Sequence, residues 1–205
     1  MDMPDDGTRT EGGRVLSLTS LATFASEQIT AKDFFALDVD EKIKVELIGG
    51  ALIMSPSARY WHTLAGFRLA RVLEDTLGDQ FLFVTDTDVA IDDVTVVRPD
   101  VFVVDPVKPG TDRVGTAEEV LLAVEIVSPG SKTMDRRVKP SLYRNAGILS
   151  WRIERDRERL FLVETPVVGE ERTHLGTATL VVAGVDVTVD LDAIARYAFR
   201  TNRLT

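Results

Sequence analysis

The sequence predicts an α/β or α+β fold, in which a mixed central β-sheet is flanked by helices. Three observations support this prediction. Residues 60–77 have the apolar periodicity of an amphipathic helix, several short strand-like runs follow them, and residues 121–127 are nearly all apolar, which is typical of a strand buried on both faces. Such segments alternate along 205 residues, of which 44% are hydrophobic, and this suits a single domain.

The first predicted elements are a short helix, a hairpin and the long helix. Residues 31–36 follow Thr30, whose side chain suits an N-cap. Residues 43–54 form two β-rich runs around Gly49 and Gly50, which predicts a β-hairpin that extends the domain on its N-terminal side. Within 60–77, the apolar residues fall at 61, 64, 65, 69, 72, 73 and 77. Short strands are then expected at 81–85, 88–91, 94–97 and 100–104.

The second half adds the buried strand at 121–127 and further pairs of strands. Met134, Val138 and Leu142 are spaced by four, which predicts a helix that ends near 145–147, with Pro140 in its first turn or at a kink. Two strands around a charged turn, two late strands and a short closing helix complete the chain, at 148–153, 159–164, 177–182, 185–189 and 191–197.

Composition excludes several classes of site and of partner. The 33 acidic and 24 basic residues give a net charge of −9, so a generally basic nucleic-acid coat is ruled out. There are no cysteines, and the two histidines, His62 and His174, cannot build a three-histidine metal site. A metal would be held mainly by carboxylates, which favours a hard ion such as magnesium.

The termini predict no membrane association. The N-terminal residues lack the basic and apolar regions of a signal peptide, and no run approaches the ~20 apolar residues of a membrane span, so we expect a cytoplasmic protein. Residues 1–14 are rich in glycine and acids, which predicts a flexible tail before a single domain over 15–205. The apolar segment 193–199 could form a homodimer interface or equally cap the core.

Positive charge is concentrated in one segment. Residues 1–131 carry a net charge of −12 and residues 160–205 carry −2, whereas residues 132–159 carry +5. That segment is the one candidate for a surface that faces a polyanion such as DNA, although an ordinary solvated helix and strand face would show the same charge.

Three acids lie within apolar strands. Glu125 lies between Val124 and Ile126, where burial costs several kcal/mol unless the carboxylate is paired or binds a cation. Asp100 opens the run at 100–104 and Glu46 lies inside the hairpin. Each has an alternative role: a salt-bridged strand-edge acid for Glu125, a strand-start aspartate for Asp100, and an outward-facing residue for Glu46. Together, acids on neighbouring strands can converge on one divalent cation.

Lys139 and His62 are the basic groups that could assist these acids. Lys139 stands four residues from both Asp135 and Tyr143, so a helix would place the three on one stripe. There Lys139 could hold a phosphate or orient a water, or it could be a solvated surface lysine. His62, at the start of the long helix, could be a base or a supporting donor, or a structural histidine.

Several short motifs follow one another in a characteristic order. In chain order these are Val45-Glu46-Leu47-Ile48-Gly49-Gly50, Met54-Ser55-Pro56-Ser57 followed by His62, Val97-Arg98-Pro99-Asp100-Val101, Val124-Glu125-Ile126-Val127-Ser128-Pro129-Gly130-Ser131, Asp135-Arg136-Arg137-Val138-Lys139 with Leu142-Tyr143 and Ala146-Gly147, and Ser150-Trp151-Arg152-Ile153-Glu154. In the order and spacing of these motifs, from about residue 30 to residue 195, the chain resembles the bacterial Uma-type "putative restriction endonuclease" family, within the PD-(D/E)XK nuclease superfamily.

The resemblance implies a restriction-endonuclease-like domain with a magnesium or manganese site. Its ligands would be Asp100, Glu125 and the carbonyl of Ile126, with Glu46 completing the acidic cluster. The superfamily usually has a lysine two residues after the glutamate, but Val127 stands there. As in the Uma-type family, the lysine would instead come from the next helix, as Lys139, with His62 and Tyr143 as supporting residues.

The leading hypothesis is therefore a magnesium-dependent DNA endonuclease. Lys132, Arg136 and Arg137 would contact the DNA backbone, weakly and with strong salt dependence, and a homodimer would help to cut both strands. The alternative is a catalytically inactive nuclease-fold module for binding or regulation, with structural acids. A two-carboxylate glycosidase ranks last, because aromatic residues make up only 7% and none cluster near Asp100 or Glu125.

Overall fold

The computed structural model describes residues 14–15, 28–38, 43–55, 59–106 and 115–200. The predicted tail over 1–14 lies outside the described residues except for Arg14, which begins a two-residue strand, β1 (Arg14–Val15). This strand pairs in parallel with β2 (Leu37–Asp38), and the sequence predicted neither strand.

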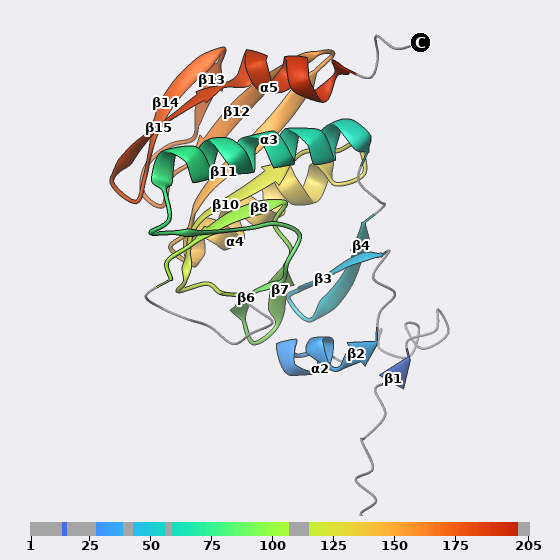
Figure 1. The fold of residues 1–205 in the computed structure, drawn as a ribbon. Helices are drawn as coiled ribbons and strands as arrows, with labels where there is room; N and C mark the ends of the chain where they lie inside the picture. The colour runs from blue at the N-terminus through green and yellow to red at the C-terminus, as the bar shows by residue number, and fades with distance from the viewer. Residues whose placement is uncertain (1–13, 16–27, 39–42, 56–58, 107–114, 201–205) are drawn as a thin grey trace, which may run out of the picture.

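The main layer is a mixed six-stranded sheet in the order β13-β12-β11-β10-β8-β5 (Figure 1). The predicted mixed sheet is confirmed, since β10 and β11 are parallel and all other neighbours are antiparallel. Of its strands, only β13 was not expected. The strands are β5 (Leu82–Val84), β8 (Val101–Val104), β10 (Val120–Ile126), β11 (Leu149–Asp156), β12 (Arg159–Thr165) and β13 (Arg172–Leu175).

The two strands around 88–97, which we expected in the central sheet, belong to a second sheet. Its order is β4-β3-β7-β6-β9, so the predicted hairpin is joined by the strands around 88–97. The turn of the hairpin has positive φ angles at Gly49 (57°) and Gly50 (82°), a conformation that glycine adopts without steric cost. The strands are β3 (Lys44–Ile48), β4 (Ala51–Ser55), β6 (Val89–Asp92), β7 (Thr95–Val97) and β9 (Gly115–Thr116).

Helices cover both faces of the main sheet. On one face lie α3 (Tyr60–Leu77), which matches the predicted helix, the hairpin of β14 (Thr177–Val182) and β15 (Val185–Asp190), and α5 (Leu191–Ala198). On the other lies α4 (Lys139–Asn145). The predicted short helix is α2 (Ala31–Phe35), capped by Thr30. None of the described helices is long and apolar enough to cross a membrane.

Strand β10 is buried on both faces, as its composition predicted. Leu122, Val124 and Ile126 belong to the core beneath α3, whereas Ala123 belongs to the core beneath α4. Because side chains alternate along a strand, Glu125 points to the same side as Ala123. The alternation therefore aims this acid at α4 and away from the larger core.

The helix expected over 134–145 has two parts. Residues 134–138 form a π-helical turn, η2 (Met134–Val138), and α4 begins at Lys139 with Pro140 in its first turn. Pro140 lies in the first turn of α4, as expected, and the backbone of η2 continues directly into that turn. At the C-terminus, the apolar segment 193–199 contributes Ile194, Ala198 and Phe199 to the core, so it caps the core of its own chain.

We predict that Gly66 is needed where α3 crosses the end of β10. A Cβ atom at this position would lie 3.1 Å from Cδ1 of Ile126, so this buried side chain would have to shift to admit a larger residue. Gly66→Leu should lower the free energy of unfolding by about 1–3 kcal/mol through overpacking. Urea unfolding measures this, with the exposed Thr63→Leu on the same helix as the control; equal stability of both variants would contradict it.

Candidate functional site

Antiparallel pairing brings the two expected ligand acids together. Strand β8 runs antiparallel to β10, with Val101 opposite Val124, so the start of β8 lies beside the end of β10. The backbone N–H of Asp100 donates to the carbonyl oxygen of Val124 at 3.1 Å, just before Glu125. Both carboxylates are buried, with exposed fractions of 7% for Asp100 and 3% for Glu125.

Lys139 is the hub of the site. Its Nζ atom lies 2.8 Å from Oε1 of Glu46, 3.0 Å from Oε1 of Glu125 and 3.7 Å from Oδ1 of Asp135. The side chain is fully buried, so Lys139 is not the solvated lysine of the alternative interpretation. The hydroxyl of Tyr143 donates to the same Oε1 atom of Glu125 at 2.5 Å, so two members of the predicted stripe contact Glu125 and the third, Asp135, contacts Lys139.

Asp100 has a separate set of partners. Nζ of Lys44 lies 3.0 Å from Oδ1 of Asp100, and Nε2 of His62 lies 3.1 Å from Oδ2. The backbone N–H of Ile126 donates to Oδ2 at 2.7 Å. Ile126 therefore contacts Asp100 through its amide, whereas the role of its carbonyl as a metal ligand, which the resemblance implies, stays a prediction.

Glu46 joins the hairpin sheet to this centre. It is buried in the middle of β3, so the alternative of an outward-facing residue is wrong. Its Oε1 atom accepts a hydrogen bond of 2.7 Å from the backbone N–H of Arg98 as well as the contact from Lys139. The guanidinium of Arg98 is in turn fixed by Asp88, at 2.8 Å from Nε to Oδ1.

The two candidate ligand acids have opposite electrostatic environments. Burial alone would raise the pKa of Asp100, but the Lys44 ammonium and His62 hold this pKa well below its usual range. Burial raises the pKa of Glu125 to about 8 despite Lys139, and Asp135 and Asp100 add to that rise. Burial also raises the pKa of Asp135. For Lys139 burial acts to lower the pKa, but the carboxylates of Glu125, Glu46 and Asp135 raise it.

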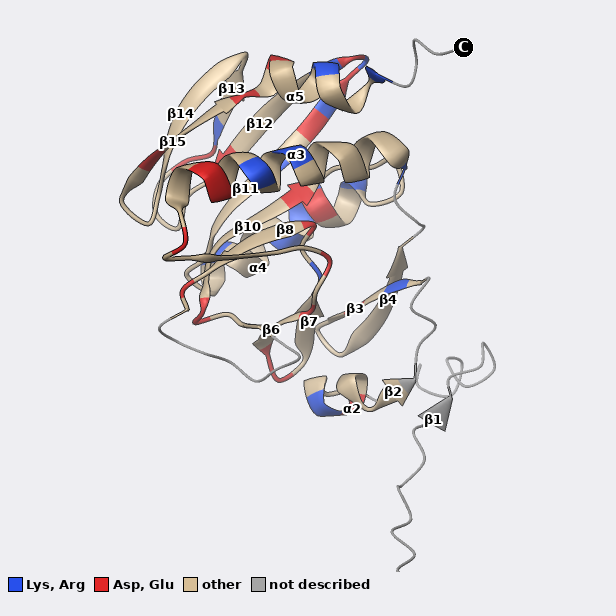
Figure 2. Ribbon diagram, viewed as in Figure 1, with Lys and Arg blue, Asp and Glu red and all other residues tan. Residues whose placement is uncertain are grey.

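The buried centre has an excess of negative charge. Glu46, Asp100, Glu125 and Asp135 are four acids, whereas Lys44 and Lys139 supply two ammonium groups. With every group ionised and His62 neutral, two negative charges stay without a counter-charge. Figure 2 shows acidic and basic segments side by side at the ends of β8 and β10.

This donor set fits a hard divalent cation in part. Carboxylate and carbonyl oxygens suit magnesium, and a charge of +2 would balance the excess. However, the described residues contain no group of three or more acid, histidine or cysteine side chains close enough to enclose a metal. Asp100 and Glu125 would therefore hold the ion as a pair, with backbone carbonyl, water and substrate oxygens as the other ligands, a common arrangement for magnesium.

The three residues expected to contact DNA lie outside this centre. Lys132, Arg136 and Arg137 are all exposed, on or just before η2. The guanidinium of Arg136 is paired with Glu154, a buried acid on β11. Of the same basic segment, Lys139 and Arg152 are buried and paired, so only part of its charge reaches the surface.

Lys44 is the site residue that sequence reasoning missed. It stands two residues before Glu46 in the same strand, so both side chains point to the same face of β3. This period of two was the available signal, since any basic residue two positions from a buried strand acid is a candidate partner. The side chain of Lys44 is 22% exposed, whereas Lys139 is 2% exposed, so Lys44 is the lysine nearer to solvent.

Comparisons with known proteins agree with this fold. A family model described as "Uma2: Putative restriction endonuclease" matches residues 31–190. A solved structure from Anabaena variabilis, a putative nuclease belonging to DUF820, is similar with a TM-score of 0.68 and 15% identity, over 83% of this chain and 99% of that one. At this identity the likeness shows a common fold. No curated protein matches the chain.

We predict that loss of the Lys139 charge destabilises the protein strongly. Lys139→Met leaves the buried acids Glu46, Glu125 and Asp135 without their shared ammonium group, and breaking a buried ion pair costs about 3–5 kcal/mol. Urea unfolding near neutral pH should show this loss, whereas Lys132→Met, at an exposed position, should change stability by less than about 0.5 kcal/mol. A Lys139→Met protein as stable as wild type would show that the acids are not ionised.

A second prediction concerns the pH dependence of stability. The pKa of Glu125 is about 8 in the folded chain, against an ordinary value of 4.5, so the folded state keeps a proton that the unfolded chain releases. Its contribution to stability is complete below the ordinary value and is lost as the pH rises towards 8. The free energy of unfolding of wild type minus that of Glu125→Gln should therefore fall over this range. A constant difference would contradict the raised pKa.

Proposed function

Because the chain belongs to the Uma2 family of putative restriction endonucleases, we propose that it is a magnesium-dependent nuclease that hydrolyses phosphodiester bonds of DNA. The observation that carries the proposal is the buried centre of Asp100, Glu125 and Lys139, in which acids outnumber ammonium groups at the ends of two paired strands. Two acids and a lysine in this order along the chain match the PD-(D/E)XK pattern, with the lysine moved from position 127 to the helix.

The metal would be held by the carboxylates of Asp100 and Glu125 and by the carbonyl of Ile126. When bound, it would supply Lewis acidity towards a phosphoryl oxygen and make a water molecule more acidic. A proton stays on Glu125 up to a pH of about 8 without this cation, so binding should release a proton near neutral pH.

Lys139 acts as a permanent positive charge. Three carboxylates raise its pKa, so it cannot serve as a base near neutral pH. Its ammonium group donates hydrogen bonds, and it can orient a water or stabilise the negative charge that develops on the phosphoryl group. Glu46 and Tyr143 are positioning residues, since Glu46 contacts the Lys139 ammonium and Tyr143 donates to the Glu125 carboxylate.

Lys44 and His62 orient Asp100. Both side chains contact its carboxylate and keep it ionised, which a metal ligand requires. Lys44 is partly exposed, so its ammonium can also contact a phosphate that enters from solvent. Lys132, Arg136 and Arg137 are the proposed contacts to the DNA backbone from η2, and a homodimer would supply a second centre for the opposite strand.

One observation favours the alternative of an inactive nuclease-fold module. Lys44 and Lys139 already pair with the acids, and no cluster of three ligand side chains exists in the described residues. In that case the acids and lysines would only hold the two sheets together. The chain would then bind its partner without cleaving it.

We predict that magnesium binding and DNA cleavage are lost together. Calorimetric titration with magnesium or manganese, alone and with a DNA duplex, should show saturable binding that Glu125→Gln abolishes. Cleavage of plasmid DNA by Asp100→Asn or Glu125→Gln should fall by at least about 100-fold, the scale of a lost charge-stabilising group.

The control for both assays is Glu170→Gln, which removes an exposed acid outside the centre. If wild type binds no metal with or without DNA, while its fold and melting temperature are normal, the nuclease proposal fails. The inactive module would then be the better description.

A further inference from the structure

Three exposed arginines, one on α3, one on β11 and one just after α5, lie over aromatic rings. The Cζ atom of Arg68 lies 5.8 Å from the ring centroid of Tyr197, and that of Arg200 lies 5.2 Å from the same ring. The Cζ atom of Arg155 lies 4.6 Å from the ring of Phe199 and 5.3 Å from that of Trp61. We call these six residues the arginine–aromatic surface.

These arginines lack the carboxylate partners that others in the chain have. Arg71, Arg172 and Arg196 each form an ion pair, with Asp75, Glu164 and Asp190. Within the part of the chain that the structure describes, Arg68, Arg155 and Arg200 form no ion pair with an acid. Two guanidinium groups near one Tyr197 ring repel each other, and an anion placed between them would relieve this repulsion.

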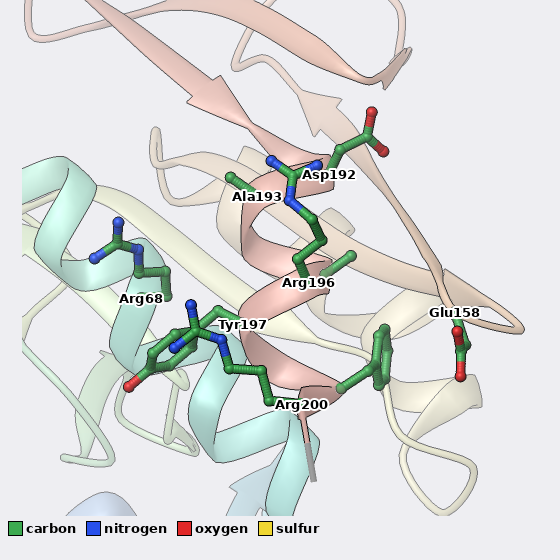
Figure 3. A pocket seen from close by; sticks show the side chains of 9 residues that line it. Arg68, Glu158, Asp192, Ala193, Arg196, Tyr197 and Arg200 are labelled. Carbon is green, nitrogen blue, oxygen red and sulfur yellow. The ribbon is translucent and has the colours of Figure 1, made fainter. Parts of the chain in front are cut away.

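The surface borders a hollow large enough for a ligand. An open depression of about 680 Å³ is lined by Arg68, Tyr197 and Arg200, and also by Arg196. Figure 3 shows Arg68, Tyr197 and Arg200 gathered on one side of α5. The lining also contains the acids Glu158 and Asp192, so positive charge dominates near Tyr197 and not over the whole hollow.

The surface is connected to the candidate active site through ring contacts. The rings of Trp61 and Phe199 lie 5.8 Å apart, and those of Trp61 and His62 lie 6.0 Å apart. Nε2 of His62 then contacts Asp100. The start of α3 and the end of α5 lie at the same end of the molecule (Figure 1), so the first turn of α3 contacts both the arginine–aromatic surface and the candidate active site.

We infer that the arginine–aromatic surface binds backbone phosphates of the DNA next to the phosphate that is cleaved. Guanidinium groups bind phosphate oxygens through paired hydrogen bonds, and the rings hold them ready for this contact. The inference rests on the proposed nuclease function, and it gives the DNA a second surface in addition to Lys132, Arg136 and Arg137. It also gives the acidic chain a local positive surface for a polyanion.

The test compares two variants that each remove two charges. Arg68→Gln/Arg200→Gln changes the arginine–aromatic surface, and Lys132→Gln/Arg137→Gln changes the η2 surface. The affinity of each protein for a fluorescently labelled DNA duplex is measured by anisotropy, without metal so that no cleavage occurs, between about 50 and 200 mM salt. Cleavage by wild type with magnesium is measured separately on the same duplex.

We expect the Arg68/Arg200 variant to reduce the slope of log affinity against log salt by about 1.8, which is the loss of two phosphate contacts. Its affinity near 0.1 M salt should fall by on the order of 50-fold. An unchanged slope in this variant, or no DNA binding by wild type, would overturn the inference. A reduced slope in this variant, with no cleavage by wild type, would support the surface and contradict the nuclease. Cleavage by wild type, with an unchanged slope in this variant, would support the nuclease and contradict the surface.

Discussion

The structure depends on one buried ammonium group. Nζ of Lys139 contacts Glu46 from the hairpin sheet, Glu125 from the main sheet and Asp135 from η2, so a single charge joins three separate parts of the chain. Removing such a charge leaves its partners buried and uncompensated, which is why an ion pair of this kind constrains a fold strongly even where its net contribution to stability is small. The hairpin sheet is thereby held at a defined position against the ends of β8 and β10.

Two neighbouring carboxylates differ in protonation because their partners differ. Lys44, His62 and the amide of Ile126 surround Asp100 and keep it ionised, whereas Glu125 shares its ammonium with other acids and holds its proton up to a pH of about 8. Environments that separate the pKa values of paired acids are typical of catalytic centres. Near neutral pH the chain thus holds one acid ionised and the neighbouring acid protonated.

Most of the elements and most of the centre could be predicted from the sequence, for local reasons. The N-cap residue Thr30 predicted α2, the apolar periodicity of residues 60–77 predicted α3, and the glycine pair predicted the hairpin. The position of acids within apolar strands predicted that Glu125, Asp100 and Glu46 belong to the centre. What could not be predicted depends on partners that are distant in the chain. The assignment of β6 and β7 to a second sheet, the addition of β13 as an edge strand, and the approach of Lys44 to a residue 56 positions away are all set by tertiary packing.

The π-helical turn η2 has a consequence for how the family can vary in length. The N–H of Lys139 reaches back to the carbonyl oxygen of Met134, five residues earlier, so this turn contains one residue more than an α-helical turn would. Deleting one residue here would replace the π-helical turn with an α-helical turn, and the helical segments on either side would keep their orientation because one turn closes between them in both cases. A deletion between Asp135 and Lys139 would place these residues three apart, which is still the same face of a helix. A chain of the same fold could therefore lose one residue at η2 and keep its buried lysine in place.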